Sequence, residues 1–331
     1  MNKKLLKNKV FNKIKILFYI ILSLNFSTKL SAISYNSPQE LGSSARHIAL
    51  GNVDGASTGA DAIFENIAAL YRVKTTAINI FSTSILWDVN YNNIAFAKRN
   101  KLGVFGIAYY EHIVKNNFYN PKDNPNKDHS RGDVNYYTPI GTFDDKKSIF
   151  KIAYQNDHSL LGGIHYGIAS SFHHYKSIES KGKGFDFDVS AIKIYPNFIL
   201  NASIKNIFGS SVKFKNSSYN SSVTTTAKEQ LNRQWVLSGK SHLYWIQIFP
   251  QLVFEEGNLL PSLGLSYTPG FLSDLTFFTG FKQTLESNQK KQRLSLGLSY
   301  TFKNVTFHYA YEKGEVQKFK NQNYMSLEVS L

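Results

Sequence analysis

The side chains that could carry catalysis or bind a metal are widely spaced in this sequence. None of the nine histidines stands at metal-ligand spacing from acidic residues, and the adjacent His173 and His174 would point to opposite faces of a strand. Asp157, His158 and Ser159 have the residue types of a hydrolase triad, but neighbours in one turn cannot adopt its geometry. The sequence also has no cysteine and no phosphate- or dinucleotide-binding motif. We therefore predict no enzyme, no cofactor and no metal site.

One pair of acids shares a face of a predicted strand. Asp186 and Asp188 alternate with apolar residues, and across the interior of a barrel they could meet Lys151 or Lys205. We interpret these groups as structural ion pairs. A ring of charges that selects ions is the alternative.

The elements that must position these residues are strands, because apolar side chains recur at every second position in the C-terminal third. In segment 291–302, one face carries Leu294, Leu296, Leu298, Tyr300 and Phe302, and the other carries Ser295, Gly297, Ser299 and Thr301. A period of two is typical of a strand with one apolar side. A soluble sandwich would also alternate, but small residues on the second face favour a crowded barrel interior. Aromatic residues near many strand ends resemble an interfacial belt.

The same pattern predicts an all-β fold, a transmembrane antiparallel barrel of about 14 strands. The strands are expected at residues 73–82, 85–98, 102–114, 147–156, 160–173, 184–195, 198–207, 233–241, 243–256, 260–268, 272–283, 291–302, 305–313 and 322–331. Links after even-numbered strands have three residues or fewer, whereas links after odd-numbered strands include long ones at 115–146 and 208–232. This sorting is typical of outer-membrane barrels with both termini in the periplasm. An even strand number also closes the sheet.

The first residues indicate export. Six lysines precede an apolar run at 16–24, and Leu30-Ser31-Ala32 provides a small residue for cleavage, so residues 1–32 are predicted to be a signal peptide. A membrane anchor is disfavoured because the run is shorter than the roughly 20 residues needed to span a bilayer. Removing this segment, with seven lysines and no acid, lowers the formal charge from +15 to +8. The remaining excess is spread along loops, so nucleic acid is not an expected partner.

Between the signal and the first strand, residues 33–72 form a predicted N-terminal plug or hatch, followed by the barrel at 73–331. Ile63, Ile67 and Leu70 have helical spacing behind Thr58 and Asp61 as caps, which predicts one short helix. A short helix with glycine-rich approaches would fit inside the lumen.

At these residues the chain resembles the FadL-like outer-membrane barrels, and most closely their PorV/PorQ branch. The branch has alanine-arginine, leucine-glycine, glycine-alanine and acidic-alanine pairs and then an Asn-Pro-Ala-Gly-Leu box. Here Ala45-Arg46, Leu50-Gly51, Gly55-Ala56, Asp61-Ala62 and residues 66–70 occupy those places. Ile67 replaces the proline of the box and Ala69 its glycine, and the chain ends in Leu331 where such barrels usually end in an aromatic residue. Segments 202–209, 294–300, 309–311 and 326–331 also resemble the family's strands.

The resemblance implies an outer-membrane protein that lets hydrophobic small molecules cross, with no catalysis. Arg46, Leu50, Asn66 and Ile67 in the plug are candidate site residues, and an apolar pocket is expected at Phe105, Ile107 and Tyr109 on the lumen side. The alternative is a cell-surface barrel that binds protein cargo in secretion, through loops 115–146 and 208–232. Expected partners are outer-membrane lipid, a hydrophobic ligand or a secreted protein, and the barrel assembly machinery. A soluble all-β periplasmic protein is a third reading.

Overall fold

The computed structural model describes residues 41–85, 89–119, 127–128, 136–137, 141–160, 163–178, 180–217, 224–286, 289–313 and 322–331. All of them belong to one compact unit, Ala32–Leu331. The predicted signal peptide, residues 1–32, lies outside these ranges.

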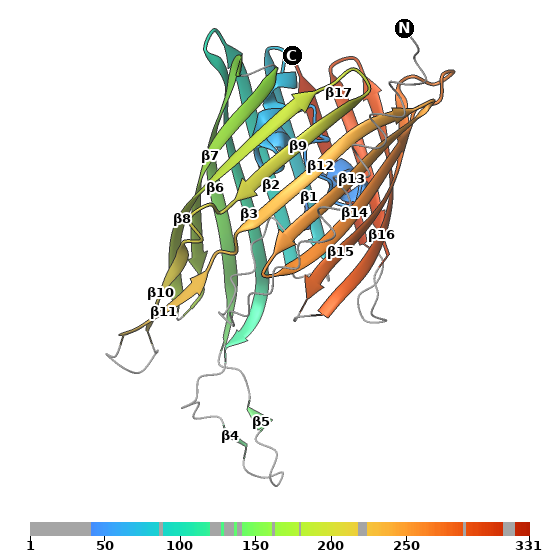
Figure 1. Cartoon of the computed structure of the whole chain (residues 1–331). Helices are drawn as coiled ribbons and strands as arrows, with labels where there is room; N and C mark the ends of the chain where they lie inside the picture. Colours follow the sequence, from blue (N-terminus) through green and yellow to red (C-terminus); the bar gives the residue numbers. More distant parts are fainter. Residues whose placement is uncertain are drawn as a thin grey trace, which may run out of the picture. The chain divides into compact units, whose positions relative to one another are not determined.

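Within the described residues, fourteen strands form a closed antiparallel barrel (Figure 1). They are β1 (Thr76–Ile85), β2 (Val89–Asn100), β3 (Gly103–Tyr119), β6 (Gly141–Leu160), β7 (Ile164–Lys176), β8 (Ser180–Ile194), β9 (Phe198–Lys205), β12 (Gln234–Leu243), β13 (Ile246–Glu255), β14 (Asn258–Tyr267), β15 (Leu275–Glu286), β16 (Gln289–Phe302), β17 (Val305–Glu312) and β18 (Gln322–Ser330). Pairing of β1 with β18 closes the ring, for example Ile80 opposite Leu327. The predicted fold class is confirmed, and each predicted strand overlaps one observed strand.

The predicted links differ from the observed ones in several places. Residues 157–159, which we expected in a turn, lie within β6, and β7 and β8 extend into the predicted link 174–183. The stretch between β14 and β15, residues 268–274, has seven residues where we expected three. In the other direction, β3 runs to Tyr119 and β6 begins at Gly141, so both ends of the predicted loop 115–146 are strand. The sequences of these outer ends, with polar runs such as Lys115-Asn116-Asn117 and Asp144-Asp145-Lys146, lack the apolar alternation by which a strand is recognised.

One wall of the barrel is taller than the other, as Figure 1 shows for β3, β6, β7 and β8 at its lower left. β3 has 17 residues and β6 has 20, whereas β13 and β14 have 10 each. The predicted loop 208–232 adds to this wall a hairpin that the sequence did not predict, β10 (Ser211–Ser217) and β11 (Thr224–Gln230). β10 continues the sheet beside β8. A further two-stranded piece comprises β4 (Lys127–Asp128) and β5 (Tyr136–Tyr137).

The outward face of the barrel is apolar and the inward face carries small or polar residues. On β3, Val104, Ala108 and Tyr110 are buried. Phe105 and Ile107 are 44% and 49% exposed, and Tyr109 shares their outward face. The expectation that Phe105, Ile107 and Tyr109 line the lumen is therefore wrong. Their bulk suits contact with hydrocarbon, whereas the interior needs small side chains.

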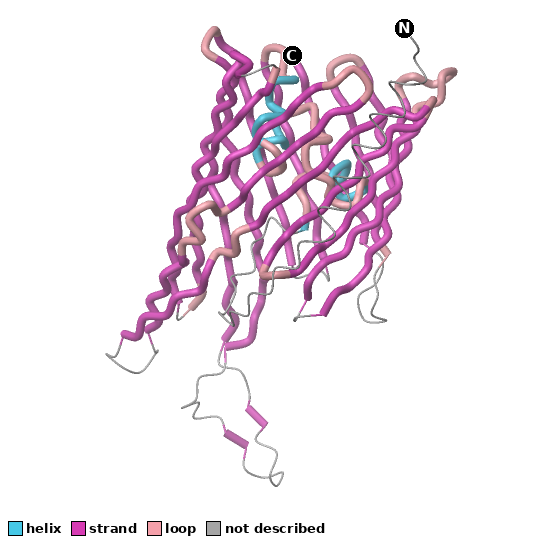
Figure 2. Tube along the Cα trace, in the orientation of Figure 1, coloured by secondary structure: helices cyan, strands magenta, loops and turns pink. Residues whose placement is uncertain are grey.

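The interior is occupied by residues 41–73, which we call the plug. It contains three short pieces in place of the single helix predicted: α2 (Ala45–Ala49), η2 (Ala60–Ile63) and η3 (Ile67–Arg72). Figure 2 shows them in cyan, enclosed by the strands. In the described part of the chain, no helix has the length and apolar character needed to cross a membrane.

Candidate functional site: the plug and the wall that holds it

Glycines in the barrel wall make room for the plug. A Cβ atom at Gly280 would lie 2.6 Å from the carbonyl oxygen of Ala49 and would overlap the amide nitrogen of Gly51. A Cβ at Gly264 would lie 2.7 Å from the carbonyl oxygen of Leu50. Main chain of the plug therefore lies directly on main chain of the wall, as only glycine permits.

A second contact is apolar and lies around η2 and η3. A Cβ at Gly106 of β3 would lie 2.5 Å from Ile63, and a Cβ at Gly167 of β7 would lie 2.7 Å from Ile67. Both isoleucines belong to a cluster of fully buried side chains that also includes Leu70. Burial of this cluster supplies a nonspecific attraction between plug and wall.

Polar side chains of the wall bind the backbone of the plug. Ser326 accepts a hydrogen bond from the Ala45 amide at 3.1 Å, and Ser190 accepts one from the Ala68 amide at 2.8 Å. Gln251 accepts from the Asp54 amide at 2.7 Å. The plug has little regular structure, so its buried amides need such partners. This need explains why the inward face is rich in Ser, Asn and Gln.

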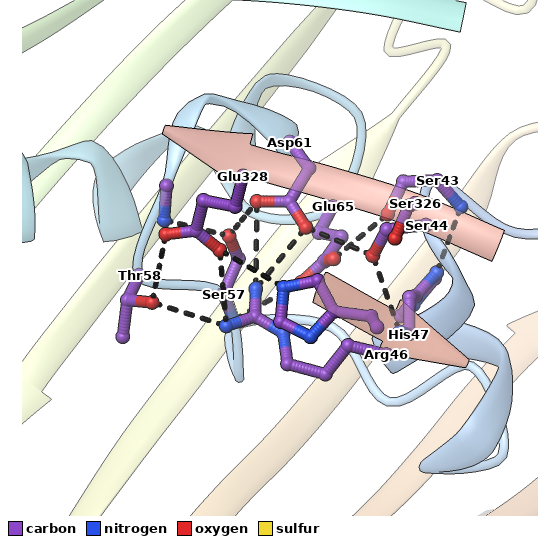
Figure 3. Close-up of polar contacts among 12 residues, drawn as sticks. Ser43, Ser44, Arg46, His47, Ser57, Thr58, Asp61, Glu65, Ser326 and Glu328 are labelled. Atoms are coloured by element: carbon purple, nitrogen blue, oxygen red, sulfur yellow. Dashed lines mark hydrogen bonds and ion pairs between the residues drawn. The ribbon is translucent and has the colours of Figure 1, made fainter. Parts of the chain in front are cut away.

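Arg46 lies at the centre of a buried ionic cluster (Figure 3). Its guanidinium is 3.1 Å from the Asp61 carboxylate in the plug and 3.7 Å from the Glu328 carboxylate on β18. Asp61 also accepts hydrogen bonds from Ser44 and Ser57. Burial alone would raise the pKa of Asp61, but Arg46 and these hydroxyls hold it below its usual range. Glu328 also lies 3.5 Å from the His308 ring on β17. Arg46 is the group that contacts both carboxylates, and it thereby ties the plug to the wall.

Glu65 lies beside this cluster and forms no ion pair with any residue that the structure describes. Its carboxyl group accepts hydrogen bonds from the Ser43 hydroxyl at 2.8 Å and the Ser57 amide at 3.3 Å. Burial raises the pKa of Glu65 to about 7, with His47 and Arg46 opposing that rise and Asp61 and Asp54 adding to it. Near neutral pH the group is therefore part protonated.

This titration makes docking of the plug pH dependent. The raised pKa means that the docked plug binds more protons than a solvated one, so docking is expected to weaken as pH rises from about 4.5 to about 7 and then level off. The total change is on the order of 3 kcal/mol. Protease protection of residues 41–73 in detergent should be greater at pH 5.5 than at pH 8. Glu65→Gln should remove the difference, and its persistence in that variant would contradict the assignment to Glu65.

A second charged chain joins the plug to β9. The Nδ1 atom of His47 accepts a hydrogen bond from the Ser43 amide at 3.1 Å, and the Nε2 atom lies 3.3 Å from the Asp54 carboxylate. The other carboxylate oxygen of Asp54 lies 2.7 Å from the Lys205 ammonium group. Burial would raise the pKa of Asp54, but Lys205 and His47 lower it. Asp54 is thus held as an anion between plug and wall.

The predicted ion pairs of the wall are present in part. Lys151 contacts Asp188 at 2.6 Å, as expected, whereas Lys205 contacts Asp54 of the plug instead. Asp186 accepts backbone hydrogen bonds from Phe208 and Ser210, in the segment that joins β9 to β10. Asp188 likewise accepts a hydrogen bond from the Asn206 amide. These acids therefore hold the segment 206–210, where β8 changes its partner from β9 to β10.

The candidate residues of the plug all lie in the barrel interior but not at one place, since Leu50 and Ile67 belong to different buried clusters. Arg46 and Leu50 are buried, and Leu50 packs over Gly264. The Asn66 side chain caps η3 by accepting from the Ala68 amide at 3.1 Å, and Ile67 packs at Gly167. Phe105, Ile107 and Tyr109 lie on the other side of the wall, so the structure does not bring the two groups together.

Sequence reasoning missed several residues that hold the plug, notably Glu65, Asp54 and Glu328. A signal was available for one of them, because Glu328 shares the inward face of its strand with Ser326 and Ser330. A lone charge on that face needs a partner of opposite sign. The sequence alone does not say which one.

Comparisons with known proteins agree with this architecture. The chain matches no protein-family model and no curated protein sequence. Among solved structures, the toluene transporter TodX of Pseudomonas putida is 9% identical, with 90% of this chain and 98% of that chain covered and a TM-score of 0.56. The fold is that of these transporters.

Two other solved structures have the same fold. The toluene transporter TbuX of Ralstonia pickettii is 10% identical over 91% of this chain and 99% of that one, with a TM-score of 0.53. A FadL homologue of Pseudomonas aeruginosa is 9% identical over 91% of this chain and all of the other, 100%, with a TM-score of 0.55. At such identities the likeness extends to the fold alone.

Proposed function

We propose that this protein is an outer-membrane channel through which hydrophobic small molecules cross, with the plug as its gate. The observation that carries the proposal is the plug itself, a separate segment that occupies the barrel interior. Apolar packing contributes to its attachment, but its specific contacts with the wall, such as those of Arg46 and Asp54, are hydrogen bonds and ion pairs. Such contacts can exchange with water when the plug shifts.

Two further observations support the proposal. The barrels with the same fold include transporters of toluene. The outward face exposes large apolar side chains on many strands, for example Ile94, Ile152 and Leu296, as contact with a bilayer requires. A hydrophobic solute could thus reach the barrel through the outer leaflet or from its outer rim.

Uptake in cells tests this function. When the full chain is produced in a Gram-negative host that lacks a hydrophobic-compound channel, initial uptake of labelled toluene or long-chain fatty acid should rise several-fold over empty vector. Uptake of a sugar of similar mass should not change. A gel-mobility shift on boiling would show that the barrel has assembled. An assembled barrel with no added uptake of either hydrophobic solute would refute the proposal.

Binding in detergent tests the role of the plug. Deletion of residues 33–58 removes Arg46, Leu50 and Asp54. If the plug forms part of the ligand site, the purified deletion variant should lose saturable fatty-acid binding that the full chain shows.

A second candidate function, as in the PorV/PorQ branch, is a surface barrel that carries protein cargo. One observation favours it: among the described strands, β11 pairs only with β10, so its other edge is open to a strand from a partner. Affinity capture from detergent extracts, compared between the unaltered full chain and its Thr226→Pro variant, tests this alternative. Recovery of the same proteins with both variants would count against it.

A further inference from the structure

A row of four aromatic side chains crosses the outward face of the tall wall. Tyr109 is opposite Phe150, Phe150 opposite Phe172, and Phe172 opposite Phe185, on the neighbouring strands β3, β6, β7 and β8. Phe150, Phe172 and Phe185 are 40%, 43% and 40% exposed. Three strand spacings give the row a width of roughly 14 Å. It lines an open groove of about 860 Å³.

From this row toward the end of the barrel where the C-terminus lies, the outward face stays apolar. Ile107 pairs with Ile152 in the next row, and Tyr154 pairs with Ile168 in the one after it. The aromatic row therefore forms the outer border of the band that faces hydrocarbon.

Beyond the row, toward the outer rim, the same face becomes strongly basic. Its exposed lysines are Lys176, Lys181, Lys183, Lys213, Lys215 and Lys228. Lys183 and Lys213 also line the groove, together with His174. Within the described part of the chain, none of the six forms an ion pair. Glu111, two residues beyond Tyr109 on β3, is already paired with Lys146.

The register places these lysines directly opposite one another. Lys176 faces Lys181, Lys181 faces Lys215, and Lys213 faces both Lys183 and Lys228. Like charges directly opposite on neighbouring strands destabilise a sheet. A sheet that keeps four such pairs beside an open groove is suited to an anion that neutralises several of them at once.

We propose that this face binds the phosphorylated glycolipid of the outer leaflet, lipid A, with its acyl chains on the aromatic row and its phosphates at the lysines. A lysine ammonium group is a compact partner for phosphate. Six lysines on four strands exceed the single charge of an ordinary phospholipid. The width of the row accommodates more than one acyl chain. This site lies outside the barrel and does not depend on transport through it.

Binding of defined lipids to the purified full chain tests the proposal. Native mass spectrometry should show bisphosphorylated lipid A retained in preference to phosphatidylglycerol. A triple variant, Lys181→Gln with Lys183→Gln and Lys213→Gln, should bind lipid A on the order of a hundredfold more weakly, at roughly fivefold per lysine. The matched control makes the same change, lysine to glutamine, at Lys98, Lys101 and Lys303. These exposed lysines lie at the opposite end of the barrel, so lipid A binding should be unchanged.

Two further binding measurements test the phosphate contacts and the acyl-chain contacts separately. Monophosphorylated lipid A should bind the unaltered protein more weakly than the bisphosphorylated form, a result that needs no variant. Phe172→Ala should weaken lipid A binding without altering any response to inorganic phosphate. Equal retention of phosphatidylglycerol and lipid A, or equal binding by the triple variant and its control, would overturn the proposal.

Discussion

Replacing Arg46 by Met is expected to release the plug from the barrel. The substitution removes the one guanidinium shared by Asp61 and Glu328 and leaves both carboxylates buried among apolar and polar neighbours. Breaking a buried ion pair from one side typically costs about 3–5 kcal/mol. The ratio of docked to released plug should therefore fall by on the order of a hundredfold or more. Protease cleavage within residues 41–73 and ion current across a planar bilayer should both increase.

The matched control is Arg233→Met, the same change at an exposed arginine, which should alter neither readout. Adding Asp61→Asn to Arg46→Met removes one of the two stranded charges, so the double variant should recover part of the protection. If Arg46→Met keeps the plug as protected as in the unaltered protein, the ionic cluster does not hold it.

Replacing Gly280 by Val is the second change with a large expected effect. A Cβ atom there would overlap main-chain atoms of Ala49 and Gly51, and no rotation of a side chain can relieve a clash with backbone. Overpacking of this kind typically costs about 1–3 kcal/mol or more. Valine suits a strand, so the barrel should still assemble while the plug is displaced. We expect higher bilayer conductance with an unchanged gel-mobility shift on boiling.

Gly239→Val is the control for this variant. Gly239 is also a strand glycine, but a Cβ there would meet only ordinary contacts, at 3.4 Å to Ile199 and 3.8 Å to Pro250. Conductance should stay at the level of the unaltered protein. Equal conductance of the two valine variants would show that the close approach at Gly280 does not position the plug.

The fourteen barrel strands could be predicted from the sequence because, in each strand, the alternation of apolar with small or polar residues shows which side chains face outward. In segment 291–302, alternate residues such as Leu296 and Leu298 face outward, as predicted, and Gly297 faces the plug. A period of two is a local property that requires no knowledge of distant residues. The same rule, applied to β3, would have placed Phe105 and Ile107 outside. The expectation of a pocket there came from the resemblance to transporters instead.

The sequence by itself determined the alternation, the number of barrel strands and the small inward side chains. The partners of the charged residues were decided only by the tertiary structure. Lys205 lies on the strand next to that of Asp188 and could have paired with it, but the plug brings Asp54 to 2.7 Å from it. Arg46 meets Glu328 although 282 residues separate them, because ring closure carries β18 past α2. Such pairings depend on the path of the whole chain, which no local pattern encodes.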